Sequence, residues 1–314
     1  MTQFRDTFTR LIMISALMSA STLASHAQDL GTLNPKPLPP LANPSDPKNS
    51  AKAAFGRKTT PTTGPTDSIG FYSKGCLAGA AALPITGPTW QVMRLSRNRN
   101  WARPEMVELL ERLSAKAPKV AGWPGILVGD MSQPRGGPMI TGHASHQIGL
   151  DADVWLTPMP NHVLSPAERE EMSAIMMVRP DRLDIDPKVW TPGQMAIIHA
   201  AADEPQVERI FVNPAIKKAM CRDAGADRAW LSKIRPYWGH DYHFHIRIKC
   251  PVGATDCKPQ DPPPAGDGCD SKDFSYWFSD AVLHPKPPKV PPKPTPPMTV
   301  AELPTACQQV LLAP

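Results

Sequence analysis

Several features that mark common protein classes are missing from this chain of 314 residues. It has no glycine-rich phosphate loop, no Gly-x-Ser-x-Gly element, no Cys-x-x-Cys pair and no internal repeat. The sequence therefore gives no support to a phosphate-loop nucleotide site, a serine hydrolase with a nucleophile elbow or a structural zinc finger. After the first 27 residues no stretch is apolar enough to cross a membrane. We therefore expect a mature protein without a membrane span.

The N-terminus is typical of a secretory signal. Arg5 and Arg10 give it a positive start, residues 11–23 are mostly apolar, and residues 25–27 resemble a small-residue cleavage site. We expect a signal peptide over residues 1–27, with a membrane anchor that is never cleaved as the alternative. Secretion argues against nucleic acid as a partner. The formal charge of +5 is modest and leaves attraction to an anionic polymer open.

The cysteines are even in number, which after a signal peptide predicts disulfides in an oxidising compartment. It also disfavours a cysteine nucleophile. Six cysteines allow fifteen full pairings, and the residues alone do not choose among them. They are Cys76, Cys221, Cys250, Cys257, Cys269 and Cys307.

Proline and helix-start signals divide the chain. Residues 34–66 and 285–297 are rich in proline, so we expect extended spacers there, flanking one domain between about residues 69 and 278. Cap and periodicity signals predict helices over 104–117, 165–178, 191–202, 213–225 and 227–234. Candidate strands are 90–95, 126–128, 150–156, 209–212 and 242–248. Because the strands do not alternate strictly with helices, we expect an α+β fold with a small antiparallel sheet surrounded by helices.

Two short segments hold five of the nine histidines, residues 142–153 and 240–245. Histidine is the commonest metal-binding side chain and titrates near neutral pH. A catalytic zinc site needs three protein ligands and one open position for water. These two segments can supply that set and leave a histidine for acid–base chemistry.

Strand periodicity places these side chains together. His243 and His245 share one face of the strand 242–248, and Asp151 and Asp153 share one face of the strand 150–156. His146 lies just before the second strand, so it can converge with Asp153 on one ion. A single histidine is more simply a hydrogen-bonded structural residue. The whole set is hard to explain by packing.

These spacings resemble a known family. His146 and Asp153 have the His-x6-Asp spacing of the LAS metallopeptidases, and His243-x-His245 is similar to their second motif. That group includes lysostaphin-type enzymes, D-Ala-D-Ala carboxypeptidases and the hedgehog domain. Residues 68–76, 142–153 and 209–216 resemble the penicillin-insensitive murein endopeptidases among them. The resemblance runs from about residue 68 to residue 278, with Cys307 also in place.

The resemblance implies the LAS/hedgehog-type fold and one firmly held zinc ion. By position, its ligands would be His146, Asp153 and His245, and His143 can also contact the metal. The family has a second, weaker metal position, which here falls on Asp181 and Asp184. Asp184 stands where that family is expected to have a histidine, so solvated acidic loop residues are an open alternative.

The same resemblance implies catalytic roles and a function. His243 would act as the base or stabilise the transition state, and His240 would orient it or protonate the leaving amine. The expected enzyme is a periplasmic zinc DD-endopeptidase that cuts D-alanyl–meso-diaminopimelate cross-links in peptidoglycan and is not inhibited by penicillin. The alternatives are a D-Ala-D-Ala carboxypeptidase or dipeptidase and a non-catalytic zinc-binding wall module. Peptidoglycan is the expected partner, and a homodimer is left open.

The resemblance also implies a domain plan and a disulfide pairing. A signal peptide (1–27) and a proline-rich segment (28–67) precede the zinc endopeptidase domain (68–280). A tail rich in proline and lysine (281–314) follows. The implied disulfides are Cys76–Cys307, Cys221–Cys269 and Cys250–Cys257, the first of which ties the tail back to the domain.

Overall fold

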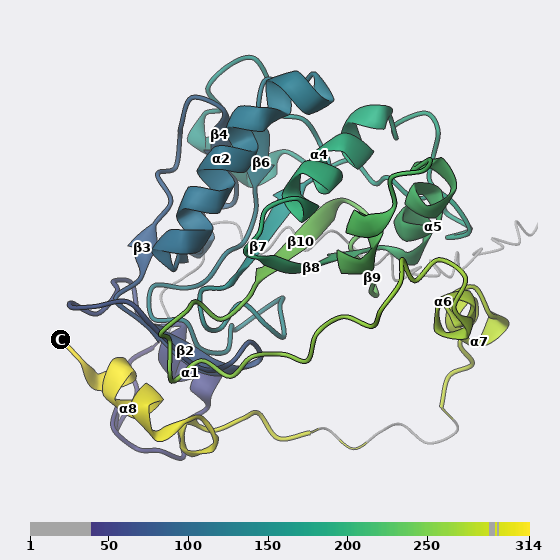
Figure 1. The fold of residues 1–314 in the computed structure, drawn as a ribbon. Helices are drawn as coiled ribbons and strands as arrows, with labels where there is room; N and C mark the ends of the chain where they lie inside the picture. The colour runs from purple at the N-terminus through teal and green to yellow at the C-terminus, as the bar shows by residue number, and fades with distance from the viewer. Residues whose placement is uncertain (1–38, 289–292, 294) are drawn as a thin grey trace, which may run out of the picture.

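A six-stranded mixed sheet lies at the centre of the fold (Figure 1). The computed structural model describes residues 39–288, 293 and 295–314, so the expected signal peptide lies outside the described residues. In spatial order the strands are β4 (Trp90–Val92), β6 (Ile126–Val128), β7 (Asp151–Trp155), β10 (His243–Ile248), β8 (Val207–Val212) and β9 (Ile234–Pro236).

The three middle strands are antiparallel, as expected. β10 pairs with β7 on one side and with β8 on the other. The outer pairs β4–β6 and β8–β9 are parallel. The sequence analysis did not predict this, because β4, β6 and β9 have only three residues each and carry almost no periodic signal. The α+β class is confirmed.

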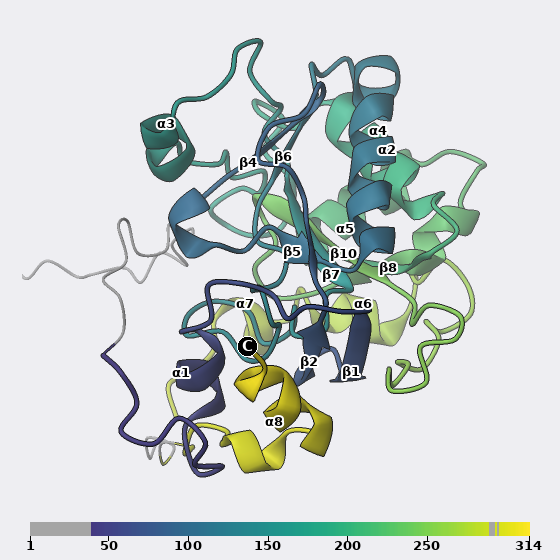
Figure 2. The same ribbon diagram turned by 90° about the vertical axis from the view of Figure 1, so that its left-hand side faces the viewer.

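Two long helices cover one face of this sheet. α2 (Pro104–Ala121) and α4 (Pro192–Ala202) pack against each other on the same side (Figure 2), and α5 (Pro214–Asp223) lies against β9. Phe244 and Ile246 of β10 are fully buried in one cluster with Leu110 of α2 and Ile197 of α4. The other face of β10 is therefore left for His243 and His245.

The helix starts follow the local signals in the sequence. Ser165 and Thr191 form capping boxes at α3 (Pro166–Glu171) and α4. The prediction that the first of these helices continues to residue 178 was wrong. The backbone N–H of Met177 donates to the carbonyl of Asp241 at 2.7 Å, and Val178 forms a β-bridge with Ile185. These contacts hold residues 177–178 extended.

A second, smaller core joins the two ends of the described chain. The hairpin of β1 (Asp67–Phe71) and β2 (Lys74–Ala78) packs with α1 (Ala51–Phe55) and α8 (Thr305–Leu312) (Figure 2). Ala51 and Phe55 are fully buried. The expectation of a purely extended spacer over residues 34–66 was therefore wrong for α1, because its apolar side chains pack against the C-terminal segment. Residues 285–288 and 295–298 form neither helix nor strand, as expected.

The three implied disulfides are present, Cys76–Cys307, Cys221–Cys269 and Cys250–Cys257. The first links β2 to α8. The remaining elements are short: the strand pair β3 (Ala81–Ala82) and β5 (Trp101–Ala102), the helices α6 (Lys272–Tyr276) and α7 (Asp280–Leu283), and the 3-10 turns η1 (Leu95–Arg97), η2 (Ala229–Lys233) and η3 (Val300–Glu302).

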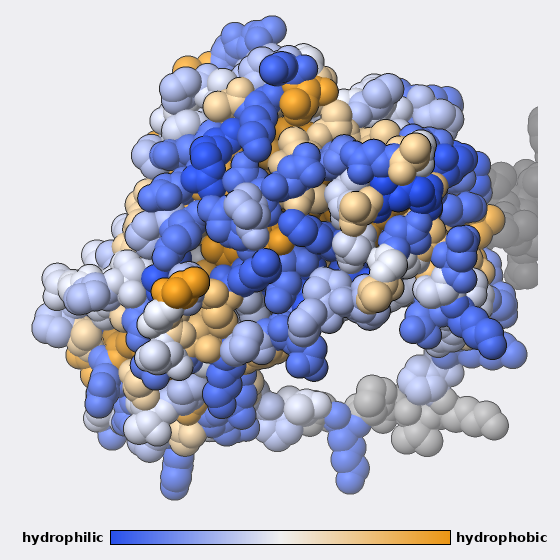
Figure 3. All heavy atoms as spheres, viewed as in Figure 1, coloured by the Kyte–Doolittle hydropathy of each residue, from blue (hydrophilic) through white to orange (hydrophobic). Residues whose placement is uncertain are grey.

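The face seen in Figure 3 is mostly hydrophilic, with apolar residues in small separate groups. Within the part of the chain that the structure describes, no helix combines the length and the apolar character that a membrane span requires.

Candidate metal centre

The pairing of β7 with β10 sets the site. His245 lies directly opposite Asp153 in the register, and His243 lies opposite Trp155. These side chains are on the sheet face away from the helix-covered core, as the strand periodicity predicted. His243, His245 and Asp153 are all buried.

The loop before β7 brings His146 to the same place. Its backbone has a φ of 66°, a left-handed conformation that costs energy for a residue with a side chain. Two hydrogen bonds hold it: its N–H donates to Asp151 Oδ2 at 3.0 Å, and its Nδ1 donates to the Met131 carbonyl at 2.9 Å. The imidazole is fully buried as a result.

Four histidines surround the Asp153 carboxylate. The separations are 3.5 Å from Oδ2 to His143 Nδ1, 3.5 Å from Oδ1 to His146 Nε2, 3.5 Å from Oδ2 to His243 Nε2 and 3.4 Å from Oδ1 to His245 Nδ1. All are longer than an ordinary N–H···O hydrogen bond of about 2.9–3.0 Å. The carboxylate is therefore surrounded by nitrogens without forming short bonds to them.

The outer nitrogens of three of these rings are each hydrogen-bonded to an oxygen. His146 Nδ1 faces the Met131 carbonyl, His245 Nε2 lies 2.8 Å from Asp151 Oδ1, and His143 Nε2 lies 3.0 Å from Asp130 Oδ2. A carbonyl or ionised carboxylate only accepts hydrogen bonds, so the proton of each neutral ring sits on its outer nitrogen. The inner nitrogen then presents a lone pair to Asp153, as metal-binding histidines do.

The donor set fits a metal ion. His143, His146 and Asp153 form a group whose ligand atoms lie within 4.8 Å of one another. Among the described residues, His146 Nε2 and Asp153 Oδ1 are buried without any hydrogen-bond partner, which is costly unless a ligand satisfies them. Two ligands of a tetrahedral zinc ion, each about 2.0–2.1 Å from it, lie about 3.4 Å apart. The separations from Asp153 Oδ1 to His146 and His245 match that value.

Burial and charge set the protonation of the cluster. Burial lowers the pKa of His243 to about 3 and that of His245 to about 4, although Asp153 and Asp151 oppose the shift. Both rings are thus neutral at pH 7. Burial alone would lower the pKa of His143, but the carboxylates of Asp153 and Asp130 outweigh it and raise the pKa above its usual value.

His240 lies beside the cluster. Its ring centroid is 4.8 Å from that of His243, its Nδ1 faces the Trp238 carbonyl at 2.8 Å, and its backbone φ is 55°. Burial lowers its pKa, against the opposing charge of Asp153. It lines a cleft with a volume of about 530 Å³, whose walls also include His243, His245 and the exposed aromatic rings of Tyr237 and Trp238.

Asp181 and Asp184 are engaged elsewhere. The carboxylate of Asp181 pairs with Arg179 at 2.9 Å, and that of Asp184 pairs with Arg222 at 3.0 Å and Lys218 at 3.7 Å. Neither belongs to the metal-binding group of His143, His146 and Asp153. The second metal position stays a prediction.

Sequence reasoning missed the outer partners of the histidines. Asp151 was noted only as sharing a face with Asp153, and that periodicity could have suggested its contact with His245. Asp130 follows β6, thirteen residues before His143, and no spacing rule points to it. The Met131 carbonyl is a backbone group, which leaves no trace in the sequence.

Comparison with known proteins identifies the family. The family model described as penicillin-insensitive murein endopeptidase matches residues 68–312. The chain belongs to this family. A relative of that name from Haemophilus influenzae is 45% identical over 251 residues, which cover 80% of this chain and 84% of the relative. Another, from Klebsiella pneumoniae subsp. pneumoniae, is 42% identical over 262 residues, covering 83% and 92%.

The match to the penicillin-insensitive murein endopeptidases takes in the whole candidate site. Residues 68–312 contain both histidine-rich segments, Asp130 and Asp151, and all six cysteines. The resemblance drawn from the sequence is confirmed, and it extends to α8, beyond residue 278 where the sequence comparison ended.

Proposed function

We propose that this protein is a zinc-dependent murein DD-endopeptidase of the periplasm, which hydrolyses D-alanyl–meso-diaminopimelate cross-links of peptidoglycan. The observation that carries the proposal is the position of Asp153 Oδ1, which lies 3.5 Å from His146 Nε2 and 3.4 Å from His245 Nδ1, all on buried side chains and neither contact a short hydrogen bond. Family membership supports the substrate class. The disulfides support an oxidising compartment.

In this proposal His146, Asp153 and His245 hold the metal, and His143, whose ligand atom lies within 4.8 Å of those of His146 and Asp153, can also contact it. Two nitrogens and a carboxylate oxygen are a donor set that suits zinc in hydrolytic sites. When bound, zinc would act as a Lewis acid. It would polarise the scissile carbonyl and lower the pKa of the attacking water. Asp151 and the Met131 carbonyl keep the rings of His245 and His146 in the tautomers that this binding requires.

His243 is the proposed base. Its depressed pKa of about 3 keeps the free ring neutral, so it can accept a proton from the attacking water or donate a hydrogen bond to the developing oxyanion, depending on its tautomer. His240, with its ring centroid 4.8 Å away, would orient His243 or carry the proton to the leaving amine. This chemistry uses no serine nucleophile, so penicillin would have no group to acylate.

Digestion of defined cross-linked muropeptides, with and without a chelator, tests the proposal. An endopeptidase converts dimers into monomers, a carboxypeptidase releases free D-alanine, and a non-catalytic wall module does neither. His146→Ala should lose metal and activity together, whereas His162→Ala, at a surface pair with Glu168, should keep both. Full activity in a metal-free His146→Ala protein would refute the proposal.

A further inference from the structure

Asn213 lies where a loop crosses the end of a strand. β8 is parallel to β9 and antiparallel to β10, and it lies between them in the sheet (Figure 1). The ends of β8 and β9 and the start of β10 are therefore at one edge of the sheet. The segment 237–242 joins β9 to β10, so it passes over the end of β8, which Asn213 directly follows. This segment carries His240.

Asn213 makes three hydrogen bonds at this place. Its Oδ1 accepts the backbone N–H of Ala215 at 2.9 Å, which caps α5. Its Nδ2 donates to the carbonyl of Gly239 at 3.0 Å, and its backbone N–H donates to the carbonyl of His240 at 3.0 Å. The residue is buried, at 7% exposure. Asn213 therefore ties the start of a helix to two consecutive residues of the loop.

The orientation of the Asn213 amide follows from its partners. The N–H of Ala215 needs an acceptor and the carbonyl of Gly239 needs a donor, so the amide oxygen faces the helix and the amide nitrogen faces the loop. Aspartate and serine are also good N-caps, but neither offers an amide N–H to the carbonyl. Capping of α5 alone therefore does not call for asparagine at this position.

The backbone of the loop is in an unfavourable conformation where Asn213 contacts it. Gly239 and His240 both have a left-handed backbone, with φ of 66° and 55°. Glycine adopts this conformation freely, whereas histidine does so at a cost in energy. The two carbonyls that Asn213 binds belong to these two residues. Asn213 therefore stabilises the turn from which the His240 side chain projects.

The same turn sets the orientation of the His240 ring. Its Nδ1 faces the carbonyl of Trp238 at 2.8 Å, so the proton of the neutral ring sits on Nδ1 and the lone pair on Nε2. The ring centroid lies 4.8 Å from that of His243. Among the described residues, His243 Nδ1 is buried without a hydrogen-bond partner. A small rotation of the turn would change how these two rings face each other.

We propose that Asn213 is a positioning residue, whose side-chain amide holds His240 in place beside His243. This rests on the proposed function, in which His240 orients the base or carries the proton to the leaving amine. Asn213 is not among the residues that line the cleft, so it acts through the turn at residues 239–240 rather than on the substrate. Its contribution to the rate should therefore disappear when the His240 ring is removed.

Asn213→Asp removes the donor to the loop and keeps the cap. On cross-linked muropeptide dimers it should lower kcat about 10–100-fold, the cost of a misplaced group at the reacting centre, and leave KM nearly unchanged. Asn213→Ser, which adds no charge, should do the same. In a His240→Ala background, Asn213→Asp should lower kcat by less than about twofold, because the ring through which it acts is gone. An equal factor with and without the ring would overturn the proposal.

Ser165→Ala is the matched control, because the Ser165 side chain caps a different helix, α3. It should lower the melting temperature and keep kcat. An equal loss of kcat in this variant would overturn the proposal, since the loss of any helix cap would then be the cause. Wild-type kcat in Asn213→Asp or Asn213→Ser would also overturn it. Loss of zinc from Asn213→Asp would do so too, by placing the effect at the metal ligands.

NMR gives a readout that does not depend on turnover. In a proton–carbon spectrum of the purified protein with labelled histidine, the ring signal of His240 is the one missing from His240→Ala. It should shift in Asn213→Asp and Asn213→Ser and stay in place in Ser165→Ala. An unshifted signal would refute the positioning role whether or not the protein cleaves a dimer. A shifted signal in a protein that cleaves no dimer would refute only the proposed function.

Discussion

Asp151 accepts a hydrogen bond of 2.8 Å from Nε2 of His245, and the same carboxylate accepts the backbone N–H of His146 at 3.0 Å. One side chain on β7 therefore positions two of the proposed metal-binding rings, one on β10 and one in the preceding loop. Arg247 donates to Asp151 at 2.7 Å and keeps it ionised. The geometry of the proposed centre therefore depends on a residue that is not itself one of the proposed ligands.

Asp151→Asn should weaken zinc binding without unfolding the protein. The amide retains the shape of the carboxylate but loses the charge that fixes the His245 tautomer, and such outer partners are typically worth about 10–100-fold in metal affinity. Competition with a chelating dye measures the change. Asp223→Asn, at an exposed pair with Arg222, is the control and should bind zinc normally. Equal affinities in the two variants would contradict the role of Asp151.

His243→Ala should keep zinc and the fold but lose about 10²–10⁴ in rate, the usual worth of a positioned acid–base group. Bound zinc, melting temperature and turnover should be measured on the same sample. A loss of zinc would make His243 a ligand instead. A lower melting temperature with undiminished turnover in the folded fraction would make it a structural residue.

Removing the Cys76–Cys307 bond should destabilise the fold more than removing Cys250–Cys257. The two bonds close loops with sequence separations of 231 and 7 residues. In the chain-entropy account, closing the longer loop raises the free energy of unfolding by about 5 kcal/mol, and closing the shorter one raises it by about 2 kcal/mol. Denaturant unfolding of the two double Cys→Ser variants measures the difference. A larger loss from the shorter loop would rule out this ordering.

The stability of the fold should rise in alkaline solution because of Lys217. This residue is fully buried, with its ammonium at the carbonyls of Leu231 and Asp267, and burial lowers its pKa from 10.5 to about 7. Between these two pH values the unfolded chain binds a proton that the folded protein has released. The free energy of unfolding therefore increases with pH across that window, by up to about 1.4 kcal/mol per unit.

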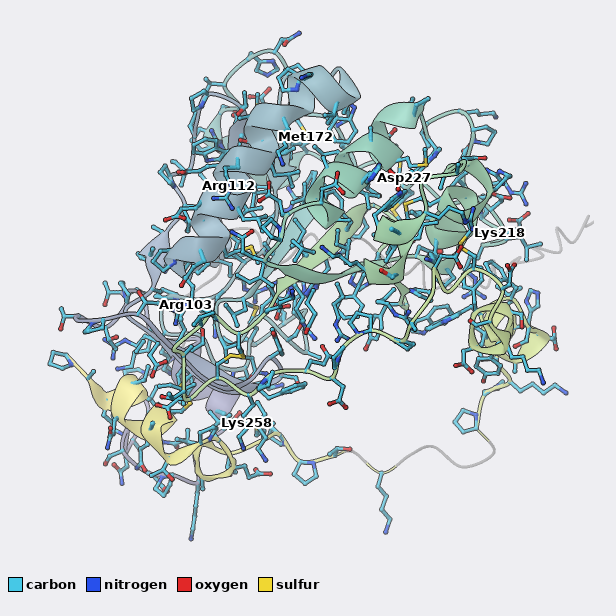
Figure 4. All side chains as sticks on the ribbon, viewed as in Figure 1. Arg103, Arg112, Met172, Lys218, Asp227 and Lys258 are labelled. Carbon is cyan, nitrogen blue, oxygen red and sulfur yellow. A yellow bond between two sulfur atoms is a disulfide. The ribbon has the colours of Figure 1, made fainter. Side chains whose placement is uncertain are left out.

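Lys217→Met should remove this contribution, whereas Lys218→Met should keep it. Lys218, labelled in Figure 4, is the next residue along α5. Its side chain is 45% exposed and pairs with Asp184. Urea unfolding at intervals from pH 7 to pH 10 distinguishes the two variants. Identical pH profiles for both would show that Lys217 does not titrate in this range.

The parts of the fold that the sequence predicted are those set by local rules. Strand alternation placed His243 and His245 on one face, and the caps at Ser165 and Thr191 marked two helix starts, because these patterns depend on neighbours within a few residues. The candidate metal centre could be proposed from the sequence for the same reason. His143, His146, Asp153 and His245 all come from two short segments whose spacing is visible in the chain.

The missed features depend on contacts between distant segments. The burial of Phe55 requires α8, some 250 residues later, and the early end of α3 reflects the bond from Met177 to the Asp241 carbonyl. A small cavity of about 60 Å³ likewise combines Arg94 and Arg97 with residues of β7 and β10. No periodicity within one segment carries this information, because tertiary packing decides it.

The bond between Cys76 and Cys307 also makes residues 76–307 a covalently closed ring. Residues 285–288 are exposed and lack regular structure, so a protease that accepts proline next to the cleaved bond can cut the backbone there. A single cut would open the ring but release nothing, since α8 would stay attached through its cysteine and its packing against α1. The nicked protein would migrate as one species on a non-reducing gel and as two after reduction. A protein built this way keeps its C-terminal helix after a cut in this exposed segment.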